Sequence, residues 1–270
     1  MITAFDEVVR LGTREVHVSV SGTRGTSPPL LLLMGLGGNS GMWQPLRGML
    51  DASRVTVAFD VPGTGRSPAG ALPLLMPHLA RLALAVLDHV GMARVDVMGV
   101  SWGGALAQQL AVTGRRRVRR LVLANTHFGI GSMPASPGAM RTLLSVDRYH
   151  DPDALADAAR HFGGKAAQMG AGMREHSAAR LAHPPSRRGY LYQMLAISTW
   201  SSLPMLPAIR KETLLLAGGD DPAVPAVNAK IMKRIMPRAE LVIVPDGGHL
   251  MLFDQAAELA PIVTDFLDRP

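Results

Sequence analysis

Short runs of mostly apolar residues recur along the first half of the chain and predict the strands of a buried sheet. Residues 30–34, 55–59, 95–99 and 121–124 form such runs, which are typical of strands covered on both faces. Residues 15–21 alternate polar and apolar side chains instead, so they predict a strand with one buried face.

Segments with a helical spacing of apolar residues alternate with these strands. The helices are expected at residues 42–50, 72–90, 103–112, 224–236 and 255–267, with two further strands at residues 213–217 and 240–244. A chain in which strands and helices alternate in this way folds into an α/β structure. Its sheet is mostly parallel and doubly wound, with helices on both faces.

The middle of the chain, residues 127–207, has a different character. It is rich in alanine, methionine, arginine, glycine and proline, its helical patterns are short, and no strand pattern stands out. Proline interrupts helices and cannot donate to a strand ladder, so this composition favours several short helices. We expect one α/β core formed by residues 1–126 and 208–270, with residues 127–207 inserted as a helical lid.

Composition and charge exclude several classes of protein. Hydrophobic residues make up 47% and charged residues 18% of the 270 residues, which is enough apolar material for a sizeable core. The net charge is +7, and Arg115, Arg116, Arg117, Arg119 and Arg120 cluster between a helix and a strand. Such a cluster is typical of a solvated helix C-terminus. Because no nucleic-acid-binding motif accompanies it, we expect no nucleic-acid partner.

The cysteine count and the hydropathy pattern bear on where the protein works. No cysteine is present, which excludes disulfides and thiolate metal sites and fits a reducing cytoplasm. Residues 1–10 contain Asp6 and Glu7 and no continuous apolar stretch, so no secretory signal is predicted. No run of about 18 uncharged apolar residues occurs, so we expect no membrane span. These features predict a cytoplasmic protein.

The strongest motif follows a predicted strand and opens a predicted helix. Gly99-Val100-Ser101-Trp102-Gly103 matches G-x-S-x-G in the setting of a nucleophile elbow. The glycines are needed because larger side chains there would collide with the neighbouring strand and helix. The turn lifts the Ser101 hydroxyl clear of the sheet, beside a helix N-terminus that favours negative charge. We therefore predict that Ser101 is a nucleophile, and the alternative is a glycine-rich turn capped by this serine.

A serine nucleophile needs a general base, and the base needs an orienting carboxylate. His249 follows the last predicted strand at the edge of the sheet where the elbow lies, and it is the best placed of nine histidines. His127, which directly follows another strand, is a weaker candidate for the base. Asp220 and Asp221 end the preceding strand and are both candidates for the acid. Asp246 is weaker, because nearness in sequence to the histidine does not make the side chains meet.

Acyl transfer also needs two backbone N–H donors for the developing oxyanion. Trp102, directly after the nucleophile, supplies one, and Leu36 in the loop after the first buried strand is best placed to supply the other. Gly35, Gly37 and Gly38 allow this loop to approach a substrate closely. The same loop lacks the G-x-G-x-x-G spacing and a Walker lysine, so no nucleotide-binding role is predicted.

Several segments resemble a known family. Residues 60–67 (DVPGTGRS) are similar to the D-x-x-G-x-G-x-S turn of α/β-hydrolases, in which nucleophile, acid and base follow one another in this order along the chain. Other segments resemble intracellular medium-chain-length poly(3-hydroxyalkanoate) depolymerases: residues 99–109, 121–126, 215–225 and 246–250, and more thinly residues 190–200 in the insertion.

The resemblance implies the α/β-hydrolase fold and a role for individual residues. It implies that Ser101 is the nucleophile and His249 the base. It assigns the acid to Asp221, because the family's aspartate directly precedes a proline, here Pro222. One departure concerns the oxyanion loop, where Met34 stands before the glycine and many relatives have histidine. The donated group is a backbone N–H, so this change bears on substrate preference rather than on the chemistry.

The expected activity is ester hydrolysis through an acyl-enzyme on Ser101, without a metal or an organic cofactor. The resemblance implies an ester with a medium-length apolar acyl chain, either a small molecule or a polymer such as poly(3-hydroxyalkanoate). A general carboxylesterase, a lactonase and a cofactor-free haloperoxidase-like hydrolase remain open, as does a ligand-binding receptor that retains a hydrolase site. Residues 115–117 could also hold the protein on a polymer granule or a membrane surface.

Overall fold

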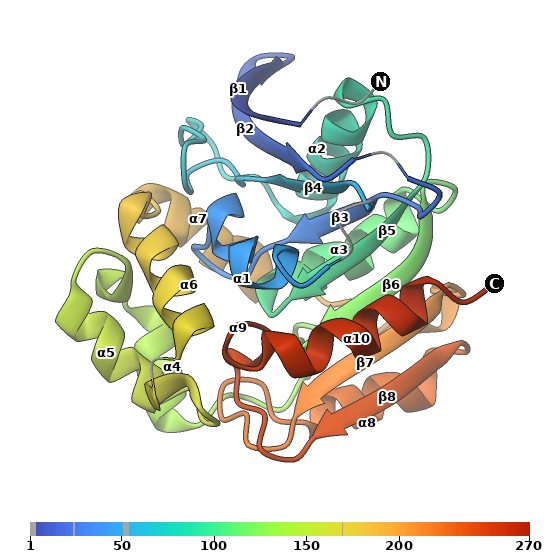
Figure 1. The fold of residues 1–270 in the computed structure, drawn as a ribbon. Helices are drawn as coiled ribbons and strands as arrows, with labels where there is room; N and C mark the ends of the chain where they lie inside the picture. Colours follow the sequence, from blue (N-terminus) through green and yellow to red (C-terminus); the bar gives the residue numbers. More distant parts are fainter. Residues whose placement is uncertain (1–3, 24, 51–53, 169) are drawn as a thin grey trace.

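One twisted sheet runs through the middle of the molecule. The computed structural model describes residues 4–23, 25–50, 54–168 and 170–270, so the segment tested for a secretory signal begins outside the described residues. In this part of the chain the sheet has eight strands in the order β1-β2-β4-β3-β5-β6-β7-β8 (Figure 1). Their bounds are β1 Phe5–Leu11, β2 Arg14–Ser21, β3 Leu30–Leu33, β4 Thr56–Phe59, β5 Val95–Val100, β6 Val118–Ala124, β7 Glu212–Gly218 and β8 Ala239–Val244.

The strands are parallel from β4 to β8, and only β1 and β2 run antiparallel to their neighbours. The predicted mostly parallel sheet is therefore confirmed, and each strand predicted from the sequence is present. β1 escapes prediction because it is an edge strand in which Val9 alone is buried. Its sequence consequently shows neither an apolar run nor a clean alternation.

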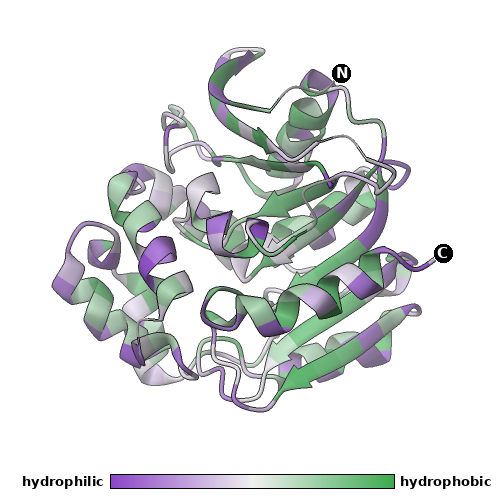
Figure 2. Cartoon of the chain, in the orientation of Figure 1, coloured by the Kyte–Doolittle hydropathy of each residue, from purple (hydrophilic) through white to green (hydrophobic). Residues whose placement is uncertain are grey.

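Helices cover both faces of the sheet, as predicted. Leu30 and Leu32 pack on the face covered by α1 (Gln44–Arg47) and α10 (Ala256–Leu267), and Leu31 and Leu33 pack on the other face. That other face is covered by α2 (Met76–His89), α3 (Trp102–Thr113) and α8 (Val227–Ile235). Successive side chains of a strand point to opposite faces, so an all-apolar strand such as β3 feeds two cores. Figure 2 shows the central strands in green, between helices that mix green and purple.

The segment between β6 and β7 is helical, as its composition predicts. It contains α4 (Pro137–Leu144), α5 (Pro152–Arg160), α6 (Ala171–Ala182) and α7 (Arg187–Ser198), with short 3₁₀ turns between some of them. In Figure 1 these helices lie beside the end of the sheet to which the arrowheads of β3, β5 and β8 point. α9 (Met251–Asp254) follows the last strand at the same end. The boundaries of a lid at residues 127 and 207 stay a prediction.

The arginine cluster differs from the expectation of a solvated helix end. Arg119 donates to both carboxylate oxygens of the buried Asp96, at 2.8 and 2.7 Å. Arg120 is only 5% exposed and pairs with Glu212 at 2.7 Å. Both side chains also donate to backbone carbonyls at the end of α10. The prediction was wrong for these two arginines because β6 begins at Val118, before its apolar run. Both arginines are therefore part of the strand and are at least partly buried.

The remaining arginines of the cluster do not form one exposed patch either. Arg117 pairs with Asp88 at 2.6 Å, while Arg115 and Arg116 are exposed. No helix in the described ranges is long and apolar enough to cross a membrane.

A contact between two glycines joins the helical segment to the core. Gly63 lies in the turn after β4 with φ of +94°, a conformation that favours glycine. A Cβ on Gly189, in α7, would lie 2.3 Å from the Gly63 carbonyl oxygen and 2.4 Å from its Cα. The same carbonyl accepts the Ser186 N–H at 2.9 Å. The start of α7 therefore lies directly on the backbone of the core.

We expect Gly189→Ala to lower the free energy of unfolding by about 1–3 kcal/mol, because the added methyl meets backbone that cannot move aside. Gly48→Ala is the matched control, since a Cβ there makes only ordinary contacts, the nearest at 3.5 Å. It should leave stability unchanged or raise it by about 0.4–1 kcal/mol. Urea unfolding measures both, and equal stabilities for the two variants would contradict this account.

Candidate active site

Ser101 lies in a sharp turn between β5 and α3. Its backbone has φ of 54° and ψ of −121°, which is strained for a residue with a side chain. A Cβ on Gly103 would lie 2.0 Å from the Leu33 carbonyl oxygen, and a Cβ on Gly99 would lie 2.3 Å from that of Gly103. Both glycines are therefore required by the steric contacts that the motif predicts.

Three side chains predicted from the sequence are in hydrogen-bonding contact at this turn. His249 Nε2 lies 3.0 Å from Ser101 Oγ, and His249 Nδ1 lies 2.8 Å from Asp221 Oδ2. The other oxygen of Asp221 accepts two backbone N–H groups, from Ala223 and Val224, each at 2.8 Å. His249 and Asp221 are each 5% exposed. The carboxylate is thus fixed in place and aimed at the imidazole.

The structure separates the candidates for the acid and the base. Asp220, adjacent to Asp221, points elsewhere and accepts the Gly164 N–H at 2.8 Å. His127 receives the Gly129 N–H on Nδ1 at 2.9 Å, so that nitrogen carries no proton. Burial, and next the neighbouring His249, lower the pKa of His127 to about 4. His127 is therefore a neutral neighbour of the site at neutral pH.

Asn125 is a residue of the site that sequence reasoning missed. It follows β6 with φ of 44°, and its amide nitrogen donates to the carbonyls of Gly248 and His249 at 2.8 and 3.0 Å. Its amide oxygen accepts the Gly218 N–H at 2.9 Å. One side chain thus joins the ends of two strands to the loop that carries the histidine. Its place in a segment similar to the depolymerases was the only signal.

The loop after β3 brings backbone close to Ser101. A Cβ on Gly35 would lie 3.5 Å from Ser101 Cβ, and the next residue is Leu36. Leu36 and Trp102, the two predicted oxyanion donors, line the same groove as Ser101.

Side chains from the helical segment hold this loop, which no sequence pattern indicated. The Tyr149 hydroxyl donates to the Leu36 carbonyl. Gln193 accepts the Gly37 N–H at 2.6 Å through its side chain and the Trp102 indole N–H at 3.0 Å through its carbonyl. The backbone around the predicted oxyanion donors therefore depends on residues of the insertion.

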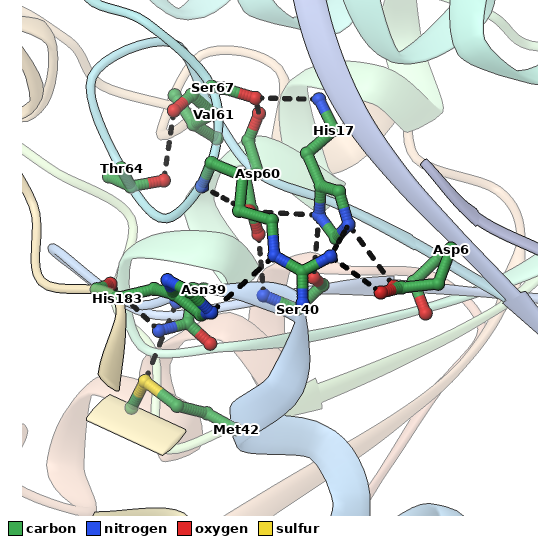
Figure 3. A network of polar contacts seen from close by, with 12 residues as sticks. Asp6, His17, Asn39, Ser40, Met42, Asp60, Val61, Thr64, Ser67 and His183 are labelled. Carbon is green, nitrogen blue, oxygen red and sulfur yellow. Dashed lines mark hydrogen bonds and ion pairs between the residues drawn. The ribbon is translucent and has the colours of Figure 1, made fainter. Parts of the chain in front are cut away.

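A buried polar network supports the other side of the loop (Figure 3). Asp60, the aspartate of the D-x-x-G-x-G-x-S turn, accepts the N–H groups of Ser40 and Arg66 at 2.6 and 2.9 Å. Its carboxylate also lies 3.0 Å from His17 Nδ1. Asn39 donates to two carbonyls at the end of α6, at 2.9 and 3.0 Å. The turn that resembles the α/β-hydrolase motif thus has a structural role, because it joins β2 to the loop after β3, and Asn39 of that loop binds the end of α6.

Two spaces meet at Ser101. A narrow inner cavity extends under the insertion, and a larger outer groove opens to solvent. Exposed apolar side chains line much of the outer groove, among them Ile130, Met140 and Leu144. The space beside Ser101 therefore extends in two directions.

In the described part of the chain, no group of three or more histidine, aspartate or glutamate side chains is arranged to hold a metal ion.

Comparisons with known proteins agree with the fold. A family model described as the alpha/beta hydrolase fold matches residues 28–256. A poly(3-hydroxyalkanoate) depolymerase from Ectopseudomonas oleovorans is 35% identical over 97% of this chain and 92% of its own. A relative from Pseudomonas savastanoi named for carbamate hydrolysis is 30% identical over 90% of this chain and 94% of its own. The crystal structure of the enol-lactonase from Burkholderia xenovorans superimposes with a TM-score of 0.83 at 26% identity, covering 97% of this chain and 100% of that one.

The depressed pKa of His127 predicts a loss of stability in acid. Below pH 6.5, His127 binds a proton in the unfolded chain, whereas in the folded chain it stays neutral down to about pH 4. Stability should therefore fall as the pH falls through this window. His127→Asn, which keeps an acceptor for Gly129, should remove about 1–3 kcal/mol of that loss. Urea unfolding at several pH values measures it, and an equally steep loss in the variant would contradict the assignment.

Proposed function

The chain belongs to the alpha/beta hydrolase family, and we propose that it hydrolyses carboxylic esters through an acyl-enzyme formed on Ser101. The observation that carries the proposal is the line of contacts from Asp221 through His249 to Ser101, at 2.8 and 3.0 Å. An ionised carboxylate only accepts hydrogen bonds, so Asp221 holds the proton of the neutral imidazole on Nδ1. This leaves Nε2 as the acceptor for the serine proton.

In the first half of the reaction, His249 takes the hydroxyl proton while Ser101 Oγ attacks the ester carbonyl. The N–H groups of Leu36 and Trp102 hold the resulting oxyanion, where charge that develops in the transition state is stabilised most. The tetrahedral intermediate then collapses. The C–O bond to the alcohol breaks, and His249 returns the proton to the departing oxygen.

In the second half, water attacks the acyl group on Ser101, and His249 removes the proton of the water. The same two N–H groups hold the second oxyanion. Collapse releases the carboxylic acid and restores the serine hydroxyl. Throughout, Asp221 stabilises the imidazolium that forms on His249 and keeps the ring oriented.

The substrate class that we propose is an ester with a medium-length apolar acyl chain, including hydroxyalkanoate oligomers or polymer. Two observations support it. The groove beside Ser101 is lined mainly by aliphatic and methionine side chains, such as Met194 and Ile197 on α7, and methionine adapts to varied apolar ligands. In addition, the relative that is 35% identical is named as a poly(3-hydroxyalkanoate) depolymerase.

The proposed roles predict that ester hydrolysis depends on the carboxylate of Asp221 and not on that of Asp220. Ser101→Ala and Asp221→Asn should each lower kcat/KM for a p-nitrophenyl ester by about 10³-fold or more, because nucleophile, base and acid act as a unit. Asp220→Asn is the matched control on the adjacent residue and should keep activity within a few-fold. Spectrophotometric turnover measures all three. Full activity in Ser101→Ala would overturn the mechanism, and binding without any turnover in the parent would favour a receptor.

The apolar groove predicts a dependence on acyl length. From acetyl to palmitoyl p-nitrophenyl esters, kcat/KM should peak at medium length. Leu144→Asp, at a position 64% exposed in the groove, should lower kcat/KM for the octanoyl ester about 10-fold, as expected when about two methylenes lose their apolar contact. The acetyl ester should be unaffected.

Leu191→Asp is the matched control, since Leu191 is 65% exposed on α7 but is not part of the groove lining. Clearing of a poly(3-hydroxyalkanoate) suspension and hydrolysis of a lactone, measured beside the ester series, separate polymer, lactone and simple ester substrates. A peak at acetyl in the parent would contradict the proposed substrate class.

A further inference from the structure

Two arginines form part of the wall of the inner cavity. Arg148 follows α4 and Arg180 lies near the end of α6, and each is only 3% exposed. Both line the same cavity as Ser101 and His249. A cavity in which an apolar acyl chain alone was bound would gain nothing from two buried cations, because removing a charge from water is costly.

Arg180 has few partners for its charge. Its Nη2 lies 3.2 Å from His176 Nε2, and its guanidinium lies 4.8 Å from the centre of the Tyr149 ring. Its Nε and Nη1 atoms are buried and have no hydrogen-bond partner. None of the ion pairs among the described residues includes Arg180 or Arg148. A guanidinium with two unpartnered donor atoms is therefore part of the wall of the cavity that Ser101 also lines.

The groups around Arg180 do not neutralise it. Burial, and then the Arg180 charge itself, hold the pKa of His176 well below its usual range, so this histidine is neutral. Burial lowers the pKa of Arg180, but a guanidinium keeps its proton in proteins. Arg148 adds a second positive charge to the same cavity.

Arg148 is held more firmly. It donates to the carbonyls of Thr142 and Ser145 at the end of α4, the second at 2.6 Å, and lies 4.9 Å from the ring centre of Tyr149. Its Nε atom is nevertheless buried without a partner. Arg148 thus contributes mainly positive electrostatic potential to the cavity, while Arg180 has two N–H donor atoms without a partner.

We propose that the inner cavity binds a carboxylate group of the substrate, with Arg180 as the residue that recognises it. The inference rests on the proposed esterase function and narrows its substrate class to esters that carry a free carboxylate. A planar guanidinium matches the geometry of a carboxylate, and hydrogen bonds between two charged groups are about twice as strong as neutral ones. The bound carboxylate would also offset the cost of burying the two cations.

The carboxylate could belong to either part of the ester. It would be on the acid part in a half-ester of a dicarboxylic acid. It would be on the alcohol part in a 3-acyloxy acid, which is the chemistry at the free carboxyl end of a hydroxyalkanoate oligomer. A mono-octyl ester of adipic acid and 3-(octanoyloxy)octanoic acid represent the two sources, and their methyl esters are the neutral counterparts.

The experiment measures kcat/KM for each acid and its neutral counterpart at neutral pH. The parent protein should prefer at least one of the acids. Arg180→Met should lower kcat/KM for that acid by about 10-fold to 100-fold, as expected when a charge-assisted hydrogen bond is lost. The neutral ester should change less than about 3-fold, because methionine keeps the apolar stem of the side chain. Arg180→Lys should restore part of the preference.

Arg187→Met is the matched control, since Arg187 is exposed at the start of α7 in the same insertion. It should leave both rates unchanged. A purely structural role of Arg180, stacked on Tyr149, would instead lower both rates together in Arg180→Met. That result, or equal rates for acids and neutral esters in the parent, would overturn the inference while leaving ester hydrolysis intact.

A second measurement does not depend on turnover. Hexanoate should raise the unfolding temperature of the parent and of Ser101→Ala but not of Arg180→Met, while hexan-1-ol should not distinguish the proteins. If no ester is hydrolysed but hexanoate still stabilises through Arg180, the proposed function fails and the carboxylate site stands. If hexanoate has the same effect on all three proteins, the site is refuted.

Discussion

The approach of two backbones at the elbow is the constraint on which the rest of the site depends. Gly103 lies so close to the end of β3 that no side chain fits between them, and Gly99 lies equally close to Gly103. This contact sets the strained backbone of Ser101, the start of α3 and the position of the loop after β3 at the same time. The carboxyl ends of β6, β7 and β8 then supply Asn125, the aspartate loop and the histidine loop at the same edge of the sheet.

The helical segment between β6 and β7 does more than cover this edge. The Tyr149 hydroxyl and the Gln193 side chain bind the loop after β3 directly. The same segment contributes Arg148 and Arg180 to the inner cavity, and aliphatic and methionine side chains to the outer groove. Contacts that hold the loop beside Ser101, and much of the lining of the two spaces next to it, therefore come from one stretch of chain.

The sequence predicts the core of this molecule well because its signals there are local. Apolar runs mark β3 to β8, and the motif alone implies that only glycine fits at positions 99 and 103. Edge strand β1 has no such signal, since only Val9 is buried. The helix ending before Arg119 and Arg120 suggested solvated side chains, and only the fold shows the carboxylates of Asp96 and Glu212 that bind them.

Some contacts at the site were predictable from the sequence, and others were not. Whether Asp220 or Asp221 faces the histidine depends on a turn of one residue, which motif similarity indicated but local pattern did not. Asn125 and Gln193 bind through their side chains to partners 93 to 156 residues away in the sequence, and two donor atoms of Arg180 have no partner. Pairings over such separations leave no periodic pattern in the sequence.

The attachment of the loop after β3 to Tyr149 and Gln193 also has an evolutionary consequence. On the proposed function, mutations at those two positions would alter substrate specificity and catalysis together. Divergence toward new substrates is therefore less constrained at Ile130, Met140 and Leu144, whose exposed side chains line the groove.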